Sequence, residues 1–174
     1  SVQRWLMVPG LPLSVLSAIY TAYLFAQAKA RDMWQNPLLP PHLLVQCLLL
    51  GSATLLPLAT WLEPGTGEPG VVSVLLWILA VTSLLHLLMI WGEVSLTHPT
   101  AHARLAIWEM VHGRYRGDFW TGTVLSIAGG LLPAIVILGG FPTSFGVGAA
   151  PLALIGMMLF ENAYVQAGQS VPLA

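Results

Sequence analysis

The chain has 174 residues, of which 56% are hydrophobic and only 7% are charged, and its formal net charge is −1. Soluble domains carry about 25% charged residues, so this composition excludes an ordinary water-soluble domain. The near-neutral charge excludes a basic surface for nucleic acid, and a single cysteine, Cys47, excludes a disulfide framework. The chain is therefore predicted to be an integral membrane protein.

Five apolar stretches are long enough to cross a bilayer core, which requires about 20 helical residues. In chain order they cover residues 6–28, 41–62, 71–96, 119–140 and 146–167. No alternation typical of barrel strands recurs, so the predicted fold class is all-α: a polytopic transmembrane helix bundle of about five spans, forming a single membrane domain over residues 1–174. Because the chain starts with Ser1 and no basic signal region precedes the first span, we expect it to be processed or to belong to a longer protein.

The segment between the first two spans, FAQAKARDMWQNPLLPPH, gathers charged, aromatic and proline residues. Lys29 and Arg31 are predicted to act partly as topology anchors, and Trp34 to join the aromatic belt at the membrane interface. Pro40 and Pro41 suit the first turn of the second span, where N–H groups lack partners in any case. This interpretation does not account for the remaining polar residues of the segment, which are Asp32, Gln35, Asn36 and His42.

Basic residues orient the spans, because cytoplasmic loops carry an excess of Lys and Arg. Of the 6 Lys and Arg residues, all except Arg4 lie in the loops at residues 29–40 and 97–118. These loops share one side of the membrane if the spans alternate, and we predict that this side is cytoplasmic. Ser1 is then outside and Ala174 inside.

The longer of these loops, THPTAHARLAIWEMVHGRYRGDFW, carries its own helix signals. Thr100 after Pro99 resembles a helix start, and Gly113 resembles a stop. His98 and His102 have the i, i+4 spacing of a metal site, but only one carboxylate and no cysteine lie nearby, so a solvated helix end is preferred and no metal site is predicted. Apolar residues at steps of three or four predict a short amphipathic helix on the membrane surface, with a stripe of Leu105, Trp108, Val111 and Tyr115.

Ionisable side chains inside the spans are costly and usually functional. In the third span, Ser83, His86, Ile90 and Glu93 follow at steps of three, four and three, which places them on one helical face. Glu161 of the last span is expected at a similar depth if the third and fifth spans are neighbours. The functional interpretation is a proton path, and the structural one is hydrogen bonding between helices. The proposed path comprises Tyr20, Lys29, Asp32, His42, His86, Glu93 and Glu161, with Lys29, Asp32 and His42 at its cytoplasmic mouth.

Two histidines of the spans, His42 and His86, are candidate haem ligands only if they lie at similar depth. His42 begins the second span, whereas His86 lies about ten residues before the end of the third, and at about 1.5 Å per residue this predicts a depth difference of about 15 Å. Two axial ligands must lie at similar depth on facing helices. No haem is therefore predicted to be held by this chain.

Three stretches, YTAYLFAQAKARDMWQNPLLPPHLLVQ, HPTAHARLAIWEMVHGRYRGDFW and ENAYVQAGQSVPLA, resemble the NrfD/PsrC-like family of polysulfide-reductase-type membrane subunits, which includes related subunits of alternative complex III. The resemblance covers nearly the whole chain. It implies a haem-free subunit that passes electrons between the quinone pool (menaquinone or ubiquinone) and an iron–sulfur partner. Molybdopterin or cytochrome subunits would belong to the same complex, located in the bacterial inner membrane.

Members of that family typically have eight or more helices in two four-helix bundles, so the chain resembles the C-terminal part of a longer subunit. The family's quinone contacts lie mainly in the N-terminal bundle, so no quinone ligand and no catalytic residue is assigned here. Two other classes remain open, a proton- or ion-coupled transporter and a purely structural membrane anchor. Bound quinone would argue against both, and substrate-dependent uptake into vesicles would favour transport.

The predicted topology is tested by labelling single cysteines introduced at Gln35 and at Thr66 in a variant that lacks Cys47. A membrane-impermeant reagent should reach Gln35→Cys and Thr66→Cys from opposite sides, because the two positions flank one span. Labelling of both positions from the same side would contradict the five-span arrangement.

Overall fold

The computed structural model describes residues 2–62 and 70–172, and this part of the chain contains no β-strand. All of its α-helices except α4 are long and apolar enough to cross a membrane, which confirms the predicted five-span, all-α fold. Thr66 and the terminal positions Ser1 and Ala174 lie outside the described residues. The helices in chain order are α1 (Val2–Ala26), the 3-10 helix η1 (Asp32–Gln35), α2 (Leu39–Leu62), α3 (Val71–Ser95), α4 (Ala101–Val111), α5 (Arg116–Leu138), the 3-10 helix η2 (Thr143–Gly148) and α6 (Ala149–Ser170).

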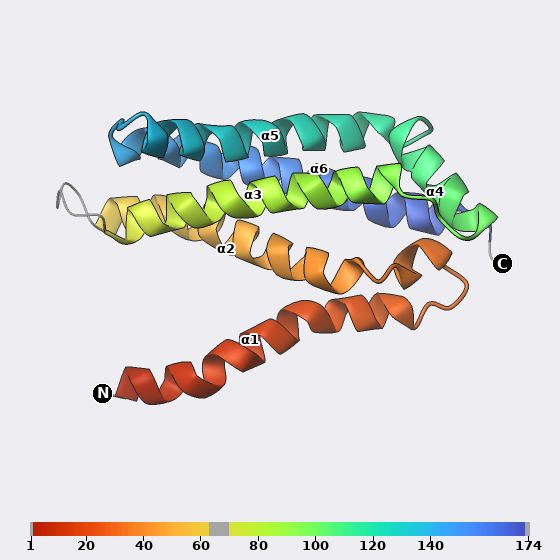
Figure 1. The fold of residues 1–174 in the computed structure, drawn as a ribbon, viewed down its shortest axis with the longest axis horizontal. Coiled ribbons are helices and arrows are strands. Elements are labelled where there is room, and N and C mark those ends of the chain that lie inside the picture. Colours follow the sequence, from red (N-terminus) through yellow and green to blue (C-terminus); the bar gives the residue numbers. More distant parts are fainter. Residues whose placement is uncertain (1, 63–69, 173–174) are drawn as a thin grey trace.

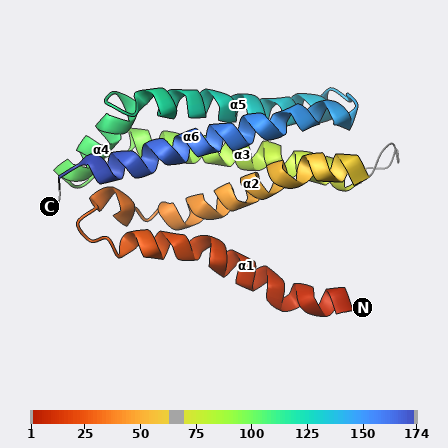
Figure 2. The same ribbon diagram turned by 180° about the vertical axis from the view of Figure 1, so that it is seen from behind.

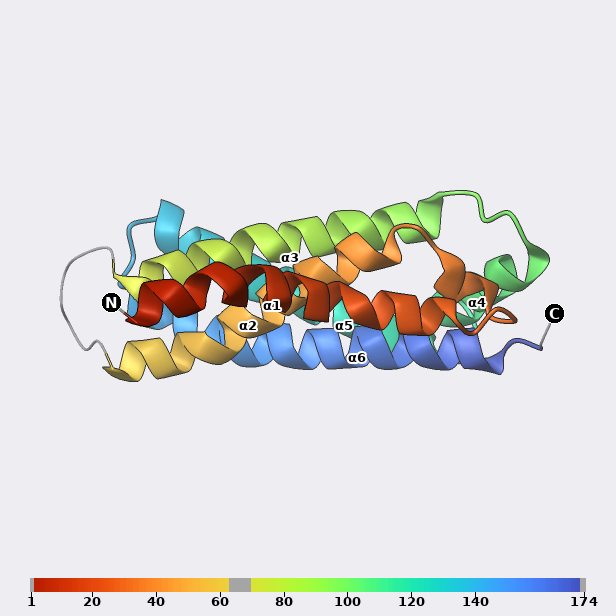
Figure 3. The ribbon, with the colours of Figure 1, turned by 90° about the horizontal axis from the view of Figure 1, so that it is seen from below.

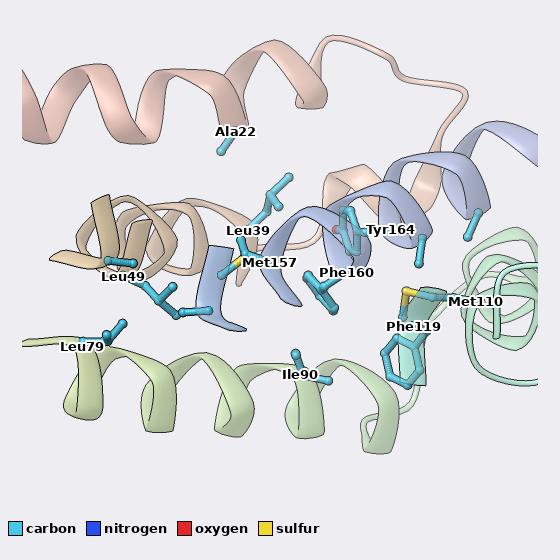
Figure 4. Packing of buried hydrophobic residues seen from close by; sticks show 14 of the residues in the cluster. Ala22, Leu39, Leu49, Leu79, Ile90, Met110, Phe119, Met157, Phe160 and Tyr164 are labelled. Carbon is cyan, nitrogen blue, oxygen red and sulfur yellow. The ribbon is translucent and has the colours of Figure 1, made fainter. Parts of the chain in front are cut away.

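Helices α2, α3, α5 and α6 form a four-helix bundle (Figures 1 and 3). Both α2 and α5 pack against α3 and α6, so α3 and α6 lie diagonally across the bundle. The expectation that the third and fifth spans are neighbours is therefore wrong, because periodicity along a helix shows which face is buried but not which helix covers it. Buried apolar side chains fill the bundle, among them Leu49, Leu79, Met157, Phe119 and Phe160 (Figure 4).

Helix α1 lies outside this bundle. It contacts α2 and η1 and diverges from α2 toward its N-terminal end (Figures 1 and 2). Pro9 and Pro12 stand inside the helix, and a proline removes a backbone donor and bends the helix. Among its described side chains only Ala22 is buried, whereas large ones such as Trp5 and Leu11 are exposed.

The segment between α1 and α2, the helix α4 and the end of α6 lie together at one end of the bundle (Figure 1). The turn between α5 and α6 lies at the other end. The two loops that contain nearly all the Lys and Arg residues therefore share one end, as predicted. We call residues 27–38 and 96–115 the basic end; that it faces the cytoplasm stays a prediction.

Small residues allow α5 and α6 to approach closely. A Cβ atom on Gly122 would lie 2.8 Å from the carbonyl oxygen of Gly156, and one on Gly129 would lie 2.8 Å from the backbone nitrogen of Ala153. Contacts between small residues are typical of membrane helices, because lipid provides no hydrophobic driving force for their association. The close approach holds α6 so that Phe160, one turn beyond Gly156, is buried inside the bundle.

The segment before α2 folds back over the end of the bundle. Trp34 of η1 is buried there and packs edge-on against Phe25, with ring centroids 4.9 Å apart. The prediction that Trp34 joins an interfacial aromatic belt is therefore wrong, because Gly168 of α6 leaves room for the indole against the helix backbone. Arg31 Nη1 donates hydrogen bonds to the carbonyl oxygens of Gly168 and Val171, at 3.2 and 2.5 Å. Arg31 thus satisfies carbonyl groups at the end of α6 that the helix leaves unpaired.

Because residues 27–38 occupy the end of the bundle, α2 begins deeper than the points where α1 and α3 end (Figure 1). Helix α2 starts at Leu39, and Pro40 and Pro41 lie in its first turn, as predicted. The deeper start carries the first polar side chains of α2 into the interior.

Helix α4 begins where the sequence indicated. The Thr100 hydroxyl oxygen accepts a hydrogen bond of 3.1 Å from the backbone nitrogen of Ala103, which is the bond of an N-cap residue. Of the stripe predicted to face the membrane, Leu105 and Trp108 are exposed, whereas Val111 is buried, because α4 packs against η1 and α6. That this helix lies on the membrane surface stays a prediction. The buried face comprises Ala103, Ala106, Ile107, Met110 and Val111.

The contact between Trp34 and Gly168 predicts the effect of a single methyl group. Gly168→Ala should destabilise the protein by about 1–3 kcal/mol, because the new Cβ atom overlaps the buried indole. Gly117→Ala is the matched control, since a Cβ atom there meets nothing within 4 Å. The midpoint of thermal unfolding in detergent should fall for Gly168→Ala only, and equal midpoints for the two variants would contradict the packing described.

Candidate functional site

Two histidines meet in the interior of the bundle. His42 Nε2 of α2 and His86 Nδ1 of α3 are 2.8 Å apart, which is a hydrogen-bond distance, and both side chains are buried. The predicted depth difference of about 15 Å is therefore wrong, because α2 begins deeper in the bundle than hydropathy suggested. The imidazole rings are in direct contact, with centroids 5.0 Å apart. That this chain holds no haem stays a prediction. The depths of His42 and His86 no longer support it, because the two side chains are in contact.

The histidine pair belongs to a layer of four rings, one from each helix of the bundle. Phe160 of α6 contacts His86 edge-on with centroids 4.9 Å apart and His42 at 5.8 Å. Phe119 of α5 completes the layer at 6.3 Å from Phe160. We call His42, His86, Phe119 and Phe160 the ring layer. The sequence marked the two histidines, but the phenylalanines carry no polar signal and could be recognised only in the fold.

Glu93 lies two turns from His86 on the same face of α3, nearer the basic end. Its Oε2 atom accepts a hydrogen bond from Asn36 Nδ2, while its Oε1 atom is buried and has no partner in the part of the chain that the structure describes. Asn36 is held in turn by its own Oδ1 atom, which accepts a bond of 3.0 Å from the nitrogen of Leu38. His98 Nε2 lies 2.8 Å from the Glu93 carbonyl oxygen. The buried face predicted for α3 is confirmed, since Ser83, His86, Ile90 and Glu93 are all buried.

A cavity of about 560 Å³ lies at the basic end between η1, the segment before α2, the end of α3 and the start of α4. Its lining includes Glu93 and Asn36 at the bundle side and Asp32, Gln35 and His98 from the loops. Apolar side chains such as those of Met33, Leu38 and Leu96 form much of the remaining wall. Of the predicted mouth residues only Asp32 lines this cavity, together with Asn36, which the anchor interpretation leaves unexplained.

The other residues of the predicted mouth lie elsewhere. Lys29 of the mouth and Tyr20, which was predicted only for the longer path, are exposed, and neither lines the cavity. His42 belongs to the ring layer inside the bundle. Asp32 also approaches His102 of α4, with Oδ2 and Nδ1 3.8 Å apart. His98 and His102 thus contact different groups, and the described residues include no cluster of three or more side chains suited to a metal ion.

Glu161 is separate from the Glu93 site. Its Oε1 atom accepts a hydrogen bond of 2.5 Å from Gln46 Nε2, one turn after His42 on α2. Both side chains line a groove that faces α1, together with Ala18 and Thr21. The carboxylates of Glu93 and Glu161 therefore have different partners, which are Asn36 for one and Gln46 for the other.

The arrangement brings three polar pairs into the membrane-spanning part of the chain, and each pair joins α2 or the segment before it to another helix. They are Asn36–Glu93, His42–His86 and Gln46–Glu161. Each pair contains at least one group that can bind and release a proton. The first pair lines the cavity. The second belongs to the ring layer, and the third opens toward α1.

A family model described as "Polysulphide reductase, NrfD" matches residues 1–172. No curated protein and no solved structure shows significant similarity to the chain.

Proposed function

The chain belongs to the NrfD family, and from this membership and the three polar pairs we propose that it is a proton-translocating membrane subunit of a quinone-linked respiratory oxidoreductase. Subunits of this family are membrane components of quinone-linked oxidoreductases. The chain itself is a multi-pass membrane protein. The observation that supports proton movement is the row of buried titratable side chains that leads inward from the cavity at the basic end.

The first step of the proposed path is at the cavity. Asp32 lies on its wall and Glu93 at its inner side, so a proton from water could be transferred to the Glu93 carboxylate. Asn36 donates to one oxygen of Glu93, which leaves the other oxygen as the atom that binds the proton. The cavity would thus act as the mouth of the path, and the basic end would face the side from which protons are taken.

The second step joins Glu93 to the histidine pair. Two helical turns separate Glu93 from His86, about 10 Å along the helix, which is too far for direct transfer. Ile90 lies between them on the same buried face. Bound water or movement of the Glu93 side chain would have to cover this distance. The pair itself is suited to transfer, because each imidazole can accept a proton on one nitrogen while it releases one from the other.

Electron transfer is proposed to lie outside this part of the subunit. The likeness to the family supports a quinone site in an N-terminal bundle, an iron–sulfur partner and molybdopterin or cytochrome subunits in the same complex. We propose the bacterial inner membrane as its location, and the C-terminal bundle of a longer subunit as its place in the protein. In this arrangement quinone chemistry in one bundle would drive proton movement in the other.

The proposal is tested by Glu93→Gln and Glu161→Gln, which keep the side-chain shape and a hydrogen bond but remove the exchangeable proton. We expect the complex to assemble, and we expect quinone-linked proton uptake to slow by about tenfold or more. Glu109→Gln on α4 is the control, because Glu109 lies outside the five spans. Its Oε2 atom accepts a hydrogen bond from the backbone nitrogen of Arg114. Asp32→Asn should slow proton uptake less than Glu93→Gln does. Asp32 lies on the cavity wall, where water can still carry protons to Glu93 without it.

Proton uptake is measured with a pH indicator in vesicles that contain the purified complex. Normal turnover and normal proton stoichiometry in both Glu93→Gln and Glu161→Gln would contradict proton transport by this bundle and leave a packing role. A defect in Glu93→Gln alone would assign the path to the cavity and the ring layer and exclude Glu161 from it.

A further inference from the structure

Three buried polar atoms at and beyond the ring layer have no hydrogen-bond partner among the described residues. They are Ser83 Oγ and His86 Nε2 of α3 and Ser126 Oγ of α5. The exposed fractions of the three residues are 1%, 0% and 2%, so bulk water does not reach them. Buried polar atoms almost always have a partner, and an ordered water molecule supplies it where the protein does not. The three atoms therefore require an explanation that the polar pairs do not give.

The packing of α3 on α5 places these atoms in one region. A Cβ atom on Gly130 would lie 2.6 Å from the Cβ atom of Ser83, so the two helices touch at this level. The helices are antiparallel and adjacent (Figure 1). One turn from Ser83 toward the basic end is His86, and one turn from Gly130 in the same direction is Ser126. Hence His86 and Ser126 lie at similar depth on facing helices.

The contacts of α6 support the same placement. A Cβ atom on Gly156 would lie 2.9 Å from Ser126 Oγ, so this hydroxyl group points to the helix that also carries Phe160. Phe160, one turn from Gly156, contacts His86 edge-on. Ser126 and His86 are thus both directed to the interior of the bundle, next to the same stretch of α6. Glycine at positions 130 and 156 allows this close packing, because a Cβ atom would lie 2.6 Å from Ser83 Cβ or 2.8 Å from Ser126 N, respectively.

The free nitrogen of His86 needs a partner whichever tautomer the ring adopts. If His86 Nδ1 donates to His42, then Nε2 is an acceptor, and if Nδ1 accepts, then Nε2 carries a hydrogen that must be donated. A hydroxyl group or a water molecule can serve in either case, because each both donates and accepts. The side chain of Phe160 can serve in neither.

We infer that Ser83, His86 Nε2 and Ser126 bind internal water, and that this water exchanges protons with the histidine pair on the side away from the cavity. The inference deepens the proposed function and rests on it for the direction of proton movement. On the route from the cavity, a proton passes from His42 Nε2 to His86 Nδ1 while the Nε2 proton of the same ring passes to the water, which passes a proton on in turn. One proton enters the ring as one leaves, and the reverse order serves the opposite direction. Ser83 and Ser126 act as positioning residues that hold the water.

This route differs from the one through Glu161. The water site lies between α3, α5 and α6, whereas Glu161 and Gln46 line the groove that faces α1. Protons that reach the histidine pair from the cavity would therefore continue along the bundle axis. Leu49, Leu76 and Leu79 are fully buried farther from the basic end. The buried Ser52 hydroxyl group, also farther along, bonds within its own helix.

The experiment compares the intact complex with the double variant Ser83→Ala, Ser126→Ala. A high-resolution cryo-electron microscopy map of the unaltered complex should show water within hydrogen-bond distance of His86 Nε2, and the double variant should lose it. The rate of proton uptake into vesicles should fall at least about tenfold in the double variant. Ser52→Ala is the control, because that buried hydroxyl group bonds to the Leu49 carbonyl oxygen of its own helix at 2.9 Å.

Two results would overturn the inference. One is a map without water at His86 Nε2, or with a protein group directly bonded to it. The other is water lost from the double variant with proton uptake unchanged. Absence of proton uptake in the unaltered complex would instead refute the proposed function, and the map would still decide whether the water site exists.

Discussion

The fold of residues 27–38 over the end of the bundle determines where every polar group of α2 lies. Trp34 packs on the backbone of α6 at Gly168, and Arg31 bonds to the last carbonyl oxygens of the same helix. These contacts fix the segment, and the segment sets the level at which α2 begins. His42 then reaches His86, and Asn36 reaches Glu93. The charged and aromatic residues that resemble a membrane anchor in the sequence thus position the interior site.

Polar groups in a membrane bundle must find partners inside the protein, because lipid offers none. The three polar pairs meet this requirement for most of their atoms, and each pair also ties α2 or its preceding segment to another helix. Among the described residues, Glu93 Oε1, His86 Nε2, the two serine hydroxyl groups and Trp34 Nε1 remain without a protein partner. Trp34 is a packing residue, so an unpaired atom alone does not indicate a proton path. Glu93 and His86 differ from it because both can bind and release a proton, and Glu93 lies at the cavity.

The sequence predicted the spans well, because length and hydropathy alone decide whether a helix can cross a bilayer. It also predicted the buried face of α3, since Ser83, His86 and Glu93 follow helical periodicity. It could not predict the meeting of His42 with His86, because the depth of α2 depends on the non-helical segment before it. Nor could it show that Glu161 bonds to Gln46, because helix order around a bundle is set by packing such as the Gly122–Gly156 contact. The same limit explains why Val111, predicted on the membrane-facing stripe of α4, is instead buried, since α4 packs against η1 and α6.

The central claim is that the histidine pair lies on the route of protons through this bundle. The most direct test is the number of protons taken up from the side of the basic end per two electrons, measured in vesicles for the intact complex and for His86→Asn. Asparagine can keep a hydrogen bond to His42 but cannot bind and release a proton. The account predicts a lower ratio with quinol turnover retained. An unchanged ratio at normal turnover would contradict it.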